Sequence, residues 1–75
     1  MVDLAELVSS FSEVLFSMGQ FAFENNGNAS SDVIKEALDE YKEAKKGYNG
    51  DTSIYDNEIN STLDTFPDLS NIERV

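Results

Sequence analysis

The chain has 75 residues, of which 15 are acidic and five are basic, so its formal net charge is −10 at pH 7. Cys, His and Trp are absent. This length allows one domain, residues 1–75, with a small core. The composition excludes disulfides, zinc–thiolate sites and imidazole chemistry. The charge argues against binding nucleic acid or anionic membranes, because both are polyanions, so we expect a basic partner.

The hydrophobic content, 40% of the residues, favours a folded chain over a disordered one. No apolar run is long enough for a membrane span. The first residues, MVDLAEL, contain none of the Lys or Arg that opens a signal peptide. We therefore expect a cytoplasmic protein.

A first helix is predicted over residues 3–24, because apolar residues recur there at alternating spacings of three and four. These residues form a seam that consists of Leu4, Leu7, Phe11, Val14, Met18 and Phe21. Asp3 is expected to cap the helix, with Glu6 completing a capping box. The helix should fade within residues 25–28, which contain Gly and Asn.

A second helix is predicted over residues 32–46, with its N-cap among residues 30–32. Its apolar stripe consists of Val33, Ile34, Ala37, Leu38, Tyr41 and Ala44. A third helix is predicted over residues 53–65 from the spacing of Ile54, Tyr55, Ile59, Leu63 and Phe66. Pro67 should end it, since proline lacks a backbone donor and restricts the preceding residue. The predicted fold is all-α, a small bundle of three short helices, and residues 67–75 either make a final turn or form a flexible tail.

Helix one is more apolar than one small partner helix can cover. Phe16 and Phe23 are seven residues apart and lie off the seam, on the outer side of the helix. One solution is a homodimer in which helix one pairs with its symmetry mate through the seam. The other is a monomer in which the third segment and the tail fold back over Phe16 and Phe23. We favour the dimer.

No arrangement of catalytic residues is present, so we expect a protein that is not an enzyme and that needs no cofactor or metal. Its serines have no His beside them to activate a nucleophile. Residues 47–58 lack the Asp and Gly positions of a calcium-binding EF-hand loop. An acyl carrier protein would have this size and acidity, but the Asp-Ser-Leu motif of that family is missing.

The acidic residues of the second half of the chain form two sets. The first follows helical spacing along one side of helix two and consists of Asp32, Glu36, Asp39, Glu40 and Glu43. The second set is Asp51, Asp56, Glu58 and Asp64, which could form a parallel row. Like charges four residues apart on a helix destabilise it by a few tenths of a kcal/mol per pair. Retention of such pairs indicates that the negative electrostatic field serves the function of the protein. The alternative is that the excess acid only keeps the protein soluble.

In size, charge and rows of acid over residues 32–43 and 51–68, the chain resembles the small host-takeover inhibitors of lytic bacteriophages, among them DNA mimics. The resemblance implies a non-enzymatic inhibitor in an infected bacterium. Its carboxylates would occupy the basic DNA-binding surface of a host protein, the nucleoid-associated protein HU first and a sliding clamp second. The class shares no single fold, so no functional residue is transferred from it.

Two other functions fit the same sequence. Immunity proteins and antitoxins are also small, acidic and helical, and they neutralise basic nucleases with their carboxylates. An adaptor protein would instead bind through Phe16 and Phe23 of helix one. Substituting these two phenylalanines would abolish binding only in the adaptor, whereas changing acids to amides would abolish it in the inhibitors.

Overall fold

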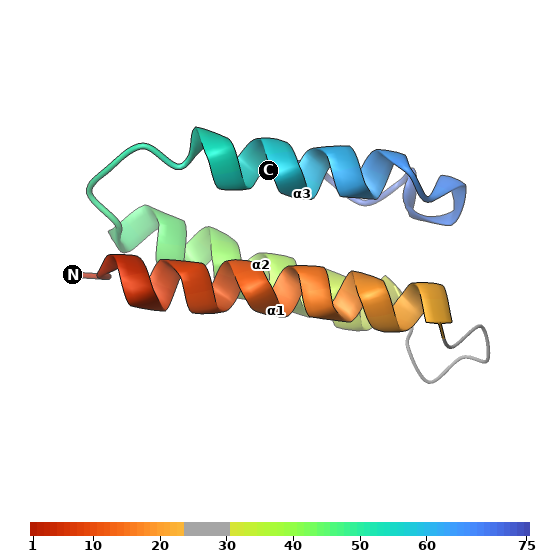
Figure 1. Cartoon of the computed structure of the whole chain (residues 1–75), viewed down its shortest axis with the longest axis horizontal. Coiled ribbons are helices and arrows are strands. Elements are labelled where there is room, and N and C mark those ends of the chain that lie inside the picture. Colours follow the sequence, from red (N-terminus) through yellow and green to blue (C-terminus); the bar gives the residue numbers. More distant parts are fainter. Residues whose placement is uncertain (24–30) are drawn as a thin grey trace.

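The structure is a computed structural model in which residues 1–23 and 31–75 are described. The described chain forms α1 (Leu4–Phe23), α2 (Ser31–Gly47), α3 (Ser53–Asp64) and a short 3-10 helix, η1 (Pro67–Leu69). α2 runs antiparallel to α1, and α3 runs back across the pair in the direction of α1 (Figure 1). The predicted all-α fold is confirmed, and the bounds predicted for helices two and three agree to within one residue. The predicted fading of helix one in residues 25–28 lies outside the described residues.

The start of α1 is fastened to the end of α2. The backbone N–H of Glu6 donates to Oδ1 of Asp3 at 2.8 Å, which is the predicted N-cap bond. The N–H of Val2 donates to the carbonyl of Gly47 at 3.0 Å. A Cβ on Gly47 would lie 2.8 Å from Cγ2 of Val2, so this close approach requires glycine. The contact joins the N-terminal segment to the last residue of α2.

The seam of α1 is used inside one chain. Leu7, Val14 and Met18 are fully buried, and Phe11 and Phe21 pack partly buried against the same core. The Phe11 ring lies 6.4 Å from the ring of Tyr41 and 5.0 Å from that of Tyr55, measured between centroids. Leu4 is an exception, because half of its surface is exposed. The core of α1 is therefore covered by α2 and α3, and the seam is not free to pair with a second copy.

The α3 helix buries Ile59 and Leu63 but leaves Ile54 80% exposed, contrary to its place in the predicted stripe. Five residues separate Ile54 from Ile59, which places them roughly 140° apart around a helix. The backbone of Phe66 is extended, as expected for a residue before proline, so α3 ends before it, at Asp64. Only one side of this short helix therefore contributes to the core.

Residues 67–75 pack onto the bundle. Leu69 is fully buried and Ile72 nearly so. The side chain of Asn60 holds the backbone of Val75 by two hydrogen bonds, of 3.1 and 3.0 Å. Of the two predicted alternatives, the structure contains the turn, followed by a segment that returns beneath α3 (Figure 1).

The tail does not cover the outer phenylalanines of α1. Phe16 is 66% exposed and Phe23 is 91% exposed, so the predicted alternative in which the third segment and the tail fold back over them does not occur. Among the described helices, none combines the length and the apolar character needed to cross a membrane.

Candidate functional site

A groove lined with acidic side chains follows the line where α1 meets α2. It consists of two adjoining hollows of about 530 and 330 Å³, which share Glu13, Asp39 and Glu40 in their walls. Six carboxylates line the groove: Glu6 and Glu13 from α1, and Glu36, Asp39, Glu40 and Glu43 from α2. Of the described residues, no Lys or Arg lines either hollow. We call the surface that these six carboxylates line the acidic groove.

Helical spacing puts the carboxylates of both helices on the same line. Glu6 and Glu13 are the only charged residues of α1, and seven residues return a helix to nearly the same side. The floor between the helices contains small side chains, among them Ser17, Ala37 and Ala44, which are buried. Because these side chains are short, the groove stays hollow while the carboxylates stand at its rims.

Few carboxylates of the groove form ion pairs. Within the described residues, Glu43 is the one member with an ion pair, to Lys46 at 3.4 Å. Both side chains of that pair are about three-quarters exposed, and such surface pairs contribute at most about 1 kcal/mol. Glu36 and Glu40 are one turn apart and repel each other by a few tenths of a kcal/mol. The groove therefore presents a field of nearly uncompensated negative charge.

Lys42, Lys45 and Arg74 lie away from the groove, at α3 and the tail. Lys45 contacts Asp56 at 2.9 Å, Lys42 contacts Glu73 at 4.0 Å, and Arg74 pairs with Asp64. Lys42, Lys45, Lys46 and Arg74 line one hollow beside the tail. Apart from the pair of Lys46 with Glu43, the paired charges thus lie on the side of α2 away from the acidic groove.

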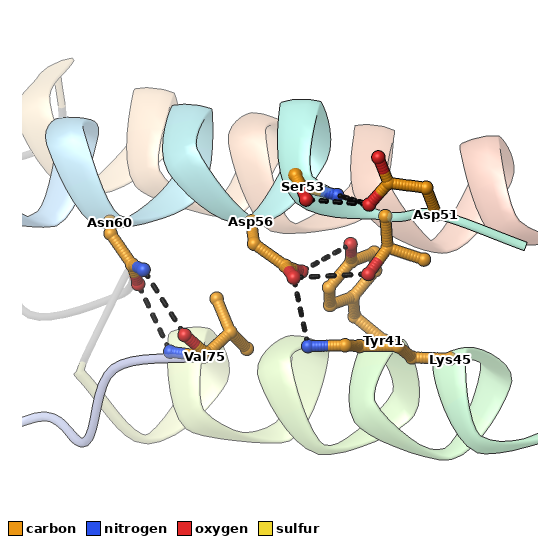
Figure 2. A network of polar contacts seen from close by, with 8 residues as sticks. Tyr41, Lys45, Asp51, Ser53, Asp56, Asn60 and Val75 are labelled. Carbon is orange, nitrogen blue, oxygen red and sulfur yellow. Dashed lines mark hydrogen bonds and ion pairs between the residues drawn. The ribbon is translucent and has the colours of Figure 1, made fainter.

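Asp56 belongs to a polar network that joins α2 to α3 (Figure 2). Its carboxylate accepts hydrogen bonds from the hydroxyl of Tyr41 at 2.8 Å and from the hydroxyl of Thr52 at 3.0 Å, besides the ion pair with Lys45. Only 18% of the side chain is exposed. Burial alone raises the pKa of Asp56, but the bonds from Lys45, Tyr41 and Thr52 outweigh it and hold this pKa below its ordinary value. Asp56 is a structural carboxylate.

Tyr41 shares that network from the core side. Its ring is fully buried, and burial together with the hydrogen bond to the charged Asp56 raises the pKa of its hydroxyl well above the ordinary value of 10.0. The hydroxyl of Tyr41 can donate to the carboxylate of Asp56 only while the hydroxyl is protonated. The network therefore stabilises one protonation state of each partner.

The remaining members of the predicted second set do not form a row with Asp56. Asp51 accepts hydrogen bonds from the backbone and the hydroxyl of Ser53 at the start of α3, which lower its pKa (Figure 2). Asp64 is paired with Arg74. Glu58 is exposed but lies two residues, or about 200°, around the helix from Asp56. The second row on α3 is therefore absent, and its place beside the α2 acids is taken by Glu6 and Glu13 of α1.

Of the first predicted set, Glu36, Asp39, Glu40 and Glu43 line the groove, and Asp32 is exposed in the first turn of α2 outside it. Glu6 and Glu13 were not among the predicted site residues. The available signal was that these two acids are seven residues apart and alternate with Ser9, Ser10 and Ser17, which marks one polar side of an otherwise apolar helix.

Within residues 1–23 and 31–75, no three acidic side chains are gathered in a way that would hold a metal ion. Comparison with known proteins found no matching family model, no similar curated protein and no similar solved structure. The chemistry of the groove is therefore the basis for a functional proposal.

Proposed function

We propose that this protein is a non-enzymatic inhibitor whose acidic groove occupies the basic DNA-binding surface of another protein, as a DNA mimic of the bacteriophage type does. The observation that supports the proposal is the double row of carboxylates along α1 and α2. A nucleoid-associated protein of the HU type is the first candidate target, and a sliding clamp is the second.

The density of charge along the groove is close to that of DNA. Glu6–Glu13 and Glu36–Glu43 each span seven residues, or about 10.5 Å of helix axis. Six carboxylates over that length amount to roughly one charge per 2 Å, compared with one per about 1.7 Å of duplex DNA. A surface that binds phosphates through Lys and Arg would therefore meet a similar linear charge in this groove.

A basic partner gains from this arrangement in two ways. The uncompensated field of the groove steers a positive surface toward it and raises the association rate, most strongly at low salt. Docking then replaces counterions on both surfaces, so that affinity falls as salt rises. The paired charges around Asp56 and Asp64 add little to this field, because a cation already lies beside each of them.

The proposal is tested by removing charge from the groove without changing its shape. In the triple variant Glu36→Gln, Glu40→Gln and Glu43→Gln, binding to purified HU and to a purified sliding clamp should weaken by at least about tenfold, with a flatter salt dependence. A matched control changes three exposed acids outside the groove, as Glu58→Gln, Asp68→Asn and Glu73→Gln, and so removes the same formal charge.

The control variant should retain most of the affinity. Equal losses of affinity in the two variants would show that only net charge matters. Unchanged affinity in the groove variant would contradict the proposal that the groove mimics DNA. Circular dichroism of each variant checks that the helices remain folded.

A further inference from the structure

One side of α1, which we call the outer face, is largely exposed and carries no charge. It contains Ala5, Val8, Ser12, Phe16, Gly19 and Phe23, and α1 has no charged residue besides Glu6 and Glu13 at the groove. In Figure 1, α2 lies behind α1 and α3 lies above it, and no other described segment covers its near side. Apart from the residues next to Gly19 and the backbone of its own helix, no heavy atom of the described residues lies within 4 Å of where a Cβ of Gly19 would be, so the surface next to the phenylalanines is open.

The exposed aromatic area is large for so small a chain. A Phe side chain can bury about 150–250 Å², so the exposed parts of Phe16 and Phe23 together amount to roughly 300 Å² per chain. If two copies covered these residues mutually, the phenylalanines would supply about 600 Å² of the roughly 1,000 Å² that a specific interface needs. The neighbouring Val8 and Ala5 lie on the same face and extend the contact.

We infer that the outer face of α1 binds a second copy of this chain in an antiparallel, two-fold symmetric contact. Two molecules with a net charge of −10 repel each other wherever their carboxylates meet, and the outer face lets two copies touch through side chains that carry no charge. A basic partner finds no counter-charge here and is directed to the acidic groove. An uncharged aromatic face on so acidic a protein is therefore best suited to binding a second copy of the same chain.

The pattern of side-chain sizes selects the antiparallel register. When the two helices of about 30 Å overlap with a shift of one residue from full length, Phe16 lies opposite the partner's Ser12 and Phe23 lies opposite the partner's Ala5. Each large ring thus meets a small side chain, as close packing requires. A parallel pairing would instead place Phe16 against the partner's Phe16, with Ser12 against the partner's Ser12.

This symmetry has a consequence for the acidic groove. A two-fold axis perpendicular to the paired helices keeps the same flank of each on the same side of the dimer. Both acidic grooves, which flank the outer face at Glu6 and Glu13, then open on one side and form a doubled acidic surface. The dimer contact itself does not depend on the proposed function, since it uses no residue of the groove.

Sedimentation of the full chain tests the contact. The wild type should show a concentration-dependent mass that approaches twice the 8.3 kDa of one chain. The dimer should become stronger as salt is added, because screening weakens repulsion between the two acidic copies. The double variant Phe16→Ser and Phe23→Ser should weaken it by about tenfold or more. Ile54→Ser, at an exposed apolar position on α3, is the matched control and should leave the dimer intact.

Cysteine cross-linking tests the register, since the native chain has no Cys. When Ser9→Cys and Gln20→Cys variants are mixed and oxidised, disulfides should form between the two different variants. Each variant alone should cross-link poorly, because the antiparallel register separates equal positions by about 15 Å, beyond disulfide reach. A wild type that is monomeric at every concentration and salt would overturn the proposal. Efficient cross-linking of each variant to itself would overturn the antiparallel register.

Discussion

The acidic groove and the network around Asp56 are both built from carboxylates, but they lie on opposite sides of α2 and have opposite surroundings. At Asp56, Lys45 and two hydroxyls satisfy a carboxylate that is largely buried. In the groove, six carboxylates lie exposed on the rims, and among the described residues one of them, Glu43, forms an ion pair, with the exposed Lys46. The position of an acid relative to the five bases therefore decides whether it stabilises the fold or remains available to a partner.

Substitution of Asp56 should have the largest effect on stability of the changes considered for the two regions. The variant Asp56→Ala leaves the buried hydroxyl of Tyr41 without its acceptor and Lys45 without its partner. We expect the free energy of unfolding to fall by about 2 to 3 kcal/mol, measured by urea denaturation. The control Glu58→Ala removes an exposed acid two residues away and should change it by less than about 0.5 kcal/mol. Equal effects of the two variants would contradict the structural role of Asp56.

The stability of the fold should depend on pH through Asp56 and Tyr41. The lowered pKa of Asp56 means that its stabilisation is complete above the ordinary value of 3.8 and is lost as the pH falls through the lowered value. The raised pKa of Tyr41 means that its stabilisation is complete below pH 10.0 and is lost as the pH rises further, because the unfolded chain then ionises first.

Thermal unfolding followed across this pH range should therefore show one loss below pH 3.8 and another above pH 10.0. The Tyr41→Phe variant has no hydroxyl to ionise and should show a smaller alkaline loss than the wild type. An undiminished alkaline loss in that variant would assign it to other groups.

In the groove, removal of charge should increase the stability of the fold, and this effect should be the smallest of those predicted. Changing Glu36 and Glu40 to Gln relieves repulsion between neighbours one turn apart, so the free energy of unfolding should rise by a few tenths of a kcal/mol. Urea denaturation at low salt detects the gain, which should shrink at high salt. A loss of stability would mean that these carboxylates make favourable contacts within the fold.

The fold could be predicted largely from local patterns. Helical spacing placed the three helices, the capping pattern at Asp3 placed the start of α1, and Pro67 marked the end of α3. Ile54 could not be assigned correctly, because periodicity alone does not say which side of a short helix meets its neighbours. The packed tail likewise depends on contacts between Asn60 and Val75 that are distant in the sequence.

The candidate site could be predicted only in part. The acids of α2 share one helix, so their common side follows from spacing. The contribution of Glu6 and Glu13 depends on which side of α1 meets α2, and the neutralisation of Asp56 depends on Lys45 and Tyr41 from another helix. These are tertiary relations, and the spacing of acids within one segment does not contain them.

We propose that the acidic groove takes the place of DNA on a basic protein surface. Competition for purified HU between a labelled DNA duplex and this chain tests it most directly, with the groove variant Glu36→Gln, Glu40→Gln and Glu43→Gln alongside. We expect the wild type to displace the duplex at low salt and the groove variant to do so far less well. Binding of the chain to HU while the duplex stays bound, or equal displacement by the groove variant, would contradict it.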